Sequence, residues 1–218
     1  MMQMSDHWRW RRGWRPGRRK YTWHVTFRDS PTVRKLAGQA QGFLAGLPGL
    51  DLVPDEWLHL TTQGIAFADE VTDAELDAIV GAARTRLTAI EPVEVTVGPA
   101  RVAGEAVLCP VAPARELTPA RDALRDAIAS VRGSGRVPGA EEWHPHVSVA
   151  YSNTTGPADA FEAALSDADS AATTTVTAVD LIRLGRDRHV YEWETYATVP
   201  LGQGAQDSDE AALSAPGS

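Results

Sequence analysis

The sequence contains a single cysteine, Cys109, among its 218 residues. One cysteine cannot form a disulfide within the chain, so a reducing cytoplasm fits this sequence. No apolar run approaches the roughly 20 residues that a membrane-spanning helix needs. The basic N-terminus is not followed by the uninterrupted apolar core of a signal peptide either. We therefore expect a cytoplasmic protein that has no membrane partner.

The spaced ligand motifs of metal enzymes are also missing, since neither His-Glu-x-x-His nor Cys-x-x-Cys occurs. His144 and His146 are two residues apart and resemble half of a metal site, but a complete site needs further ligands at suitable spacing. We expect His144 to lie at the entry of a strand, and we expect no metal or other cofactor. A metal-dependent hydrolase remains an alternative.

Charge is distributed unevenly along a chain whose composition, 43% hydrophobic and 23% charged, is that of an ordinary globular protein. The net charge is −8, yet residues 1–20 carry seven basic side chains and one acidic side chain. The rest of the chain then holds 14 basic and 28 acidic side chains. We predict a basic arm at 1–20, one domain at 21–201 and a disordered acidic tail at 202–218.

The predicted arm interleaves arginines with Trp8, Trp10 and Trp14. This mixture suits single-stranded nucleic acid, because cations bind phosphates and aromatic rings stack on bases. We predict that the arm strengthens the binding of RNA-like ligands. The alternative is that the three tryptophans pack on the domain as part of its structure.

Hydrophobic spacing and turn residues predict strands and helices that alternate along the chain. Helices are expected to start at Ser30-Pro31, at the capping box Thr72–Glu75, at Thr118-Pro119 and at Pro157. Strands are expected at 21–27, 50–53, around His59, at 93–97, 106–111, 146–151, 173–184 and 190–201. Strands mixed with helices in this order indicate an α+β fold with two sheets.

Two short segments far apart in the sequence share one pattern, a histidine, one apolar residue and a hydroxyl residue. They are Leu58-His59-Leu60-Thr61 and Pro145-His146-Val147-Ser148. Side chains two apart on a strand point the same way, so each histidine shares a face with its hydroxyl residue. If the two strands converge, the four side chains supply an acid, a base and two donors for an anion. That set suffices for phosphoester chemistry without a metal.

Four further residues are candidate substrate contacts. His24 belongs to another His-x-Thr segment on the first predicted strand and is expected to line the same cleft if that strand pairs with the His59 strand. Tyr151 and Trp193 are candidates for stacking on a base, and Arg183 for binding phosphate. Tyr151 and Trp193 also have a structural alternative, because aromatic residues on strands often belong to the core.

The paired motifs over residues 21–201 resemble the two-histidine (2H) phosphoesterase superfamily, in particular its 2′-5′ RNA ligase-like and cyclic phosphodiesterase branch. The resemblance implies a two-lobed, pseudo-symmetric α+β fold in which two antiparallel sheets flank a central cleft and helices lie outside. It implies His59 and His146 as catalytic acid and base, and Thr61 and Ser148 as phosphate-binding groups. The implied activity is metal-independent, on 2′,3′-cyclic phosphates or 2′-5′ phosphodiester links.

We therefore expect a monomeric enzyme with RNA or a nucleotide as substrate. The sequence does not tell which histidine is the base, nor whether the reaction is hydrolysis or ligation. The main alternative is an RNA-binding module that keeps this fold and lacks turnover.

Overall fold

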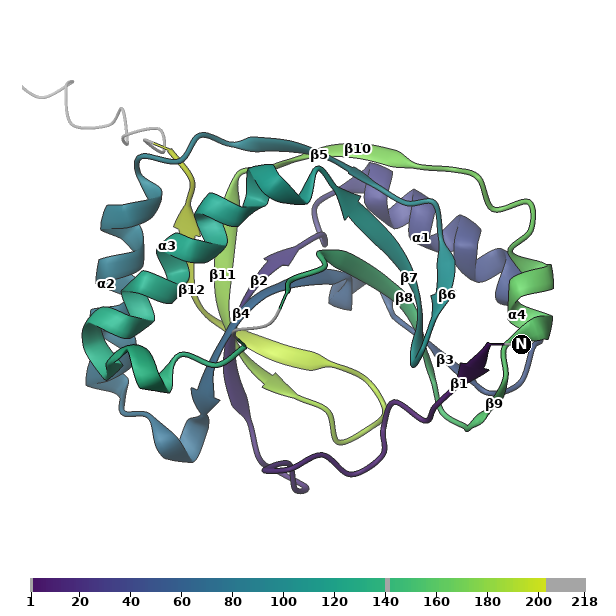
Figure 1. Cartoon of the computed structure of the whole chain (residues 1–218), viewed down its shortest axis with the longest axis horizontal. Coiled ribbons are helices and arrows are strands. Elements are labelled where there is room, and N and C mark those ends of the chain that lie inside the picture. Colours follow the sequence, from purple (N-terminus) through teal and green to yellow (C-terminus); the bar gives the residue numbers. More distant parts are fainter. Residues whose placement is uncertain (1, 140–141, 203–218) are drawn as a thin grey trace, which may run out of the picture.

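Two antiparallel sheets form the centre of the computed structural model, which describes residues 2–139 and 142–202 (Figure 1). The first sheet has the strand order β12-β11-β2-β4 and the second the order β10-β5-β7-β8-β3, with β6 paired to β7. In the first sheet the strands are β2 Lys20–Thr26, β4 His59–Phe67, β11 Ala178–Gly185 and β12 Glu192–Pro200. In the second they are β3 Leu50–Leu52, β5 Val93–Val97, β6 Arg101–Ala103, β7 Ala106–Ala112, β8 His146–Ser152 and β10 Ala172–Val176.

The helices lie on the outside of the two sheets (Figure 1). They are α1 Pro31–Leu44, α2 Asp73–Leu87, α3 Ala114–Arg132 and the short α4 Asp159–Ala164. Helices α2 and α3 pack side by side against the first sheet, and α1 packs on β8 and β10 of the second. This arrangement confirms the predicted α+β fold, and it leaves the inner faces of β4 and β8 free to form a common site. In the described part of the chain, no helix has both the length and the apolar character needed to cross a membrane.

Helix α2 begins where its capping box predicts. The Thr72 hydroxyl accepts a hydrogen bond from the Glu75 amide at 3.2 Å, and the Glu75 carboxylate accepts one from the Thr72 amide at 2.9 Å. These two bonds satisfy amides that have no partner within the helix. The buried residues that follow have helical spacing and are Leu76, Ile79, Val80, Ala83 and Leu87.

Helix α3 begins at Ala114, so the predicted start at Thr118-Pro119 was wrong. Pro119 lies inside the helix and leaves one backbone carbonyl without its donor, which costs about 3 kcal/mol. Leu117 is buried on the same face as Leu124, and burying one leucine side chain contributes about 1.5–3 kcal/mol in the opposite direction. Packing against the core therefore extends the helix one turn before the proline.

The predicted strand at 173–184 is two strands that belong to different sheets. β10 pairs with β5 and β11 pairs with β2 and β12, and the chain crosses between the sheets at Thr177. The short pair β1 (Gln3–Met4) and β9 (Gly156–Pro157) was also missed, because two residues carry no readable periodicity. Apart from Gly202, the predicted acidic tail lies outside the described residues.

The arm, which we define here as residues 2–19, runs along the lower margin of the molecule in Figure 1. Its start is fixed by backbone hydrogen bonds, from the Ser5 amide to the Gly104 carbonyl and from the His7 amide to the Ser152 carbonyl, both at 2.8 Å. Met4 is buried in the core. The three tryptophans differ, since Trp8 and Trp14 are partly buried whereas Trp10 is 76% exposed. The arm thus packs on the body at least in part, as the structural alternative anticipated.

Candidate active site

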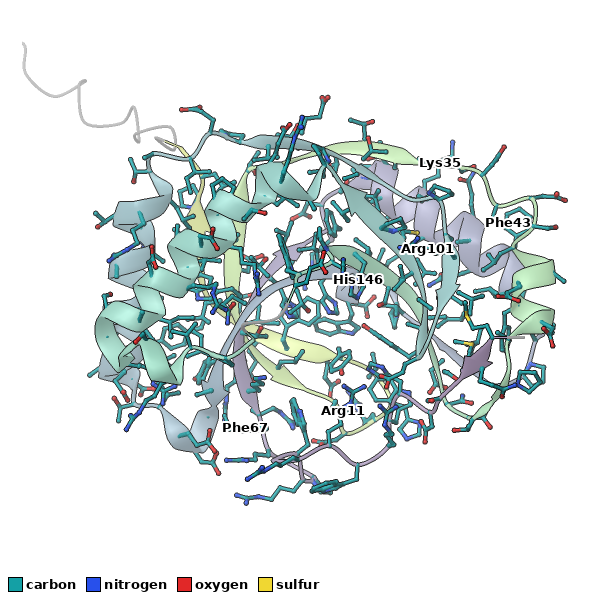
Figure 2. The ribbon with its side chains drawn as sticks, viewed as in Figure 1. Arg11, Lys35, Phe43, Phe67, Arg101 and His146 are labelled. Carbon is teal, nitrogen blue, oxygen red and sulfur yellow. The ribbon has the colours of Figure 1, made fainter. Side chains whose placement is uncertain are left out.

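A pocket of about 300 Å³ brings the two sequence motifs together. His59 and Thr61 enter it from β4, and His146 and Ser148 enter it from β8. His146 is labelled near the middle of the view in Figure 2. This volume is at the lower end of the range for small-molecule sites. The remaining lining residues are His7, Arg11, Trp14, Lys20, Thr22, His24, Gly64, Tyr151, Leu184 and Tyr191.

The two motif histidines are held in the same way. Nδ1 of His59 lies 2.8 Å from the Trp57 carbonyl oxygen, and Nδ1 of His146 lies 2.8 Å from the His144 carbonyl oxygen. A carbonyl oxygen only accepts, so each Nδ1 carries a hydrogen and donates it. In the neutral form, each Nε2 then keeps its lone pair, and in the protonated form it becomes a donor.

The surroundings of the two histidines differ. His59 is only 8% exposed, whereas His146 is exposed. Burial lowers the pKa of His59 to about 4; the hydrogen bond to Trp57 opposes this shift and the nearby His146 adds to it. His59 is therefore neutral at physiological pH.

His24 supports the β4 side of the pocket. Its ring stacks on His59 with centroids 4.3 Å apart and planes within 3°, and its Nε2 lies 3.2 Å from the Thr61 hydroxyl. Burial lowers the pKa of His24 well below its ordinary value, so the ring is neutral. Its Nδ1 is buried with no partner among the described residues. Since an unpaired lone pair is better tolerated than an unpaired N–H, we place the proton on Nε2, which donates to Thr61.

The other predicted contacts fall in three places. Tyr151 lines the pocket and stacks on His7 with centroids 4.2 Å apart. Trp193 does not line it, but its ring stands edge-on to His24 and His59 at 5.6 and 5.2 Å. Arg183 lies on the opposite face of β11 from Leu184, which does line the pocket, and its guanidinium is 3.7 Å from the Glu194 carboxylate. The structure gives Arg183 no contact with this pocket.

Sequence reasoning missed the contribution of His7 and Tyr191. His7 Nε2 lies 2.9 Å from the Tyr191 hydroxyl, and its Nδ1 lies 3.2 Å from the Glu105 carboxylate. The main effect on His7 is burial, which lowers its pKa to about 4. Arg186 holds this part of the arm in place by donating to the His7 carbonyl at 2.7 Å. These partners lie up to 184 residues apart in sequence, so no local pattern could have indicated them.

Most basic side chains of the arm are paired with carboxylates of the body. Arg9 and Arg11 contact Glu105, Arg15 and Arg18 contact Asp69, Arg18 also contacts Glu70, and Arg19 contacts Asp187. Each such surface pair contributes at most about 1 kcal/mol to stability. Their collective consequence is electrostatic, because the positive charge that the sequence suggested for a free arm is largely compensated within the molecule.

Other features of the structure are less suited to phosphate chemistry. A larger cavity of about 440 Å³ has Asp29 and Asp180 as its only charged lining residues, so it would repel an anion. Cys109 is buried, and burial raises its pKa to about 12, which leaves the thiol unreactive. Among residues 2–139 and 142–202, no group of three or more His, Cys, Asp or Glu side chains is arranged to hold a metal ion.

Two antiparallel sheets that bring two His-x-Thr/Ser motifs into one pocket define the class of two-histidine phosphoesterases. Residues 31–188 match the family model of the 2′-5′ RNA ligase superfamily, and the chain belongs to this superfamily. Membership supports a phosphoesterase function in general terms. No curated protein matches the sequence.

Solved structures share this fold at low sequence identity. The Thermus thermophilus protein TT0787 is 17% identical, with a TM-score of 0.65 over 85% of this chain and 100% of that chain. Escherichia coli LigT in its apo form is 13% identical, with a TM-score of 0.61 over 85% of this chain and 99% of that chain. The MHV ns2 PDE domain is 10% identical, with a TM-score of 0.55 over 77% of this chain and 99% of that chain. At these identities the similarity shows the fold alone.

Proposed function

We propose that this chain is a metal-independent phosphoesterase that acts on 2′,3′-cyclic phosphates or 2′-5′ phosphodiester links of RNA or nucleotides. One observation carries the proposal. Two imidazoles, each with Nδ1 bonded to the carbonyl two residues upstream, share a pocket with two hydroxyl side chains. This leaves two Nε2 atoms for proton transfer and two donors for a phosphate.

His59 is the base in this proposal. Because its pKa is about 4, it is neutral at physiological pH and its Nε2 accepts a proton from the water or ribose hydroxyl that attacks phosphorus. His146 lies on the opposite wall and is exposed. It serves as the acid, giving its Nε2 proton to the ribose oxygen as the bond from that oxygen to phosphorus breaks.

Thr61 and Ser148 stabilise the charge that develops on the non-bridging phosphate oxygens. Their hydroxyls line the pocket beside the two histidines, and donors positioned in advance at developing charge are often the largest contribution to catalysis. His24 has an indirect role, since its N–H bond to the Thr61 oxygen directs the Thr61 hydroxyl hydrogen away from the protein and toward the substrate.

A nucleotide ligand suits a pocket of this size that is lined by His7, Trp14 and Tyr191. Escherichia coli LigT, 14% identical to this chain, has been solved in complex with 3′-AMP. That complex makes adenosine nucleotides a natural first set of ligands.

The test is a panel of 2′,3′-cyclic nucleotides and 2′-5′-linked oligonucleotides, incubated with and without chelator, with the products identified. We expect turnover of at least one class that chelator does not change. Binding without turnover would instead favour an RNA-binding module. Activity lost in chelator and restored by zinc or manganese would favour a metal-dependent hydrolase.

A further inference from the structure

The pocket carries positive charge that the proposed chemistry does not use. Lys20, the first residue of β2, lines the pocket together with Arg11 and Trp14 of the arm. Lys20 lies on the same face of β2 as His24. Its ammonium lies over Gly64, because a Cβ atom placed on that glycine would be 3.3 Å from Nζ.

This position is too far from the histidine pair for a single phosphate to contact both. Gly64 pairs with Thr22, whereas Thr61 pairs with His24, two residues further along β2. His59 itself lies five residues before Gly64 on β4, roughly 17 Å along the strand, whereas one phosphate, with a hydrogen bond of about 3 Å on each side, bridges donors only roughly 8 Å apart. An anion at Lys20 is therefore a different group from the phosphate that reacts between His59 and His146.

The Lys20 ammonium has no hydrogen bond or ion pair with any residue in 2–139 or 142–202. The carboxylate that acts on it electrostatically, Glu70, is bound by Arg18 at 2.8 Å. Burial lowers the pKa of Lys20, as expected for a cation that has lost part of its hydration. The Phe67 ring lies 6.0 Å from the Lys20 nitrogen, and a phosphate at this position would supply a partner of opposite charge.

Arg11 is a second cation that lines the same pocket. One terminal nitrogen of its guanidinium binds the Glu105 carboxylate, but its Nε is buried with no partner among the described residues. Glu105 is shared with Arg9 and His7, so it compensates Arg11 only in part. In Figure 2, Arg11 lies on the arm below His146, and both residues line the same pocket.

We propose that Lys20 is the subsite for a second phosphate of the substrate, in a pocket to which Arg11 adds further positive charge. The favoured substrates then carry a phosphate besides the reacting one, either a 5′-phosphate on a cyclic nucleotide or the next internucleotide phosphate of a short RNA. This inference rests on the proposed function, which places the reacting phosphate at the two histidines. Lys20 thereby selects substrates that carry this additional charge.

Binding tests the subsite without requiring turnover. We expect adenosine 3′,5′-bisphosphate to bind about tenfold or more tightly than adenosine 3′-monophosphate in calorimetry, since a hydrogen bond to a charged group is typically worth that factor. Lys20→Met should bring this ratio close to one, and Lys20→Arg should keep most of it. The matched control is Lys35→Met, which alters the chain's other lysine, exposed on α1. Equal affinity of the wild-type protein for both ligands would overturn the subsite.

The presence of only two lysines permits a measurement on the unaltered sequence. Reductive ¹³C-methylation gives two lysine signals besides that of the terminal amine. The bisphosphate should shift the Lys20 signal and raise the Lys20 pKa, while the Lys35 signal stays in place. An unmoved Lys20 signal at saturating bisphosphate would contradict the proposal, whatever the stability of the variants.

Turnover separates this inference from the function on which it rests. We expect kcat/KM for adenosine 2′,3′-cyclic phosphate to rise when a 5′-phosphate or a 5′-linked nucleotide is added, and the larger rise identifies the source of the second phosphate. If neither compound is turned over but the bisphosphate preference persists, the function is wrong and the subsite stands. If turnover is efficient and the added phosphate has no effect, the subsite is wrong and the function stands.

Discussion

The two walls of the pocket present the same local structure in different surroundings. On β4, His59 is buried between His24 and the edge of Trp193, and its pKa is about 4. On β8, His146 is the first residue of its strand and is exposed. Both use Nδ1 in the same bond to a carbonyl at 2.8 Å. The two imidazoles thus have the same orientation but unequal burial, which allows them different roles.

This comparison is the basis of the roles proposed above, which the sequence left open. The buried wall favours a neutral imidazole and hence the base, which leaves the acid to the exposed wall, where contact with solvent allows reprotonation. In the proposed mechanism, burial determines which histidine is the base and which is the acid. The backbone hydrogen bonds determine how the two rings are oriented. The predictions below test whether both walls are needed, and then how they differ.

The largest effect is expected on removing either imidazole. His59→Ala and His146→Ala should each lower kcat by about 10²–10⁴-fold, because proton transfer by a positioned side chain contributes that much. The double variant should be little worse than either single variant, since the two groups act as one unit. Steady-state kinetics with circular dichroism as a fold control would measure this. Full activity in either single variant would show that the replaced histidine takes no part in the reaction.

Next in size is the loss of a hydroxyl. Thr61→Val and Ser148→Ala should each lower kcat by about 10–10³-fold, the range for removing one donor from a site of developing negative charge. Thr61→Ser serves as the matched control, because it keeps the hydroxyl and should retain most of the activity. A loss in Thr61→Ser as large as that in Thr61→Val would indicate packing rather than hydrogen bonding.

The pH dependence distinguishes the walls directly. With His59 as base, kcat/KM should decline only as the pH falls through about 4, the pKa of this residue in the folded protein. With a base of the ordinary imidazole pKa near 6.5, kcat/KM would already be about 30-fold lower at pH 5.

The stability of the protein also depends on the protonation of His59. The unfolded chain binds this proton near pH 6.5, so the free energy of unfolding falls as the pH drops from 6.5 toward 4. Activity at pH 5 should therefore be measured on protein verified as folded. An acidic limb near 6.5 would exclude His59 as the base.

The sequence could predict this fold and the motif strands because both follow from short-range rules. Alternation along a strand places His59 with Thr61 and His146 with Ser148, and the capping box at Thr72 marks the start of α2. These patterns need no knowledge of distant partners. The start of α3 was wrong because the burial of Leu117 outweighed the usual effect of Pro119.

The parts that sequence could not supply depend on long-range pairing. Arg183 lies outside the pocket because successive side chains of β11 point to opposite faces of the sheet. A shift of one residue along the strand would reverse which of them face the pocket. The contact between His7 and Tyr191, and the pairing of arm arginines with Glu105, Asp69 and Asp187, join segments with no shared pattern. The number of charged residues along the sequence suggested a free basic arm, because such a count does not show which arginines pair with distant carboxylates.

The smallest of these effects is expected at His24, which we treat as a positioning residue. It touches Thr61 and His59 and contacts the reacting phosphate only through them. His24→Leu removes the N–H that orients the Thr61 hydroxyl and should lower kcat by up to about tenfold, the worth of one hydrogen bond, with little change in KM. His24→Gln can donate from its own side-chain nitrogen and should restore part of the loss. A double-mutant cycle with Thr61→Val provides the decisive measurement, because a residue that acts through Thr61 has no further effect once that hydroxyl is gone. Additive losses in the cycle would mean that His24 acts by another route, such as its stacking on His59, and the two walls would then differ in more than burial.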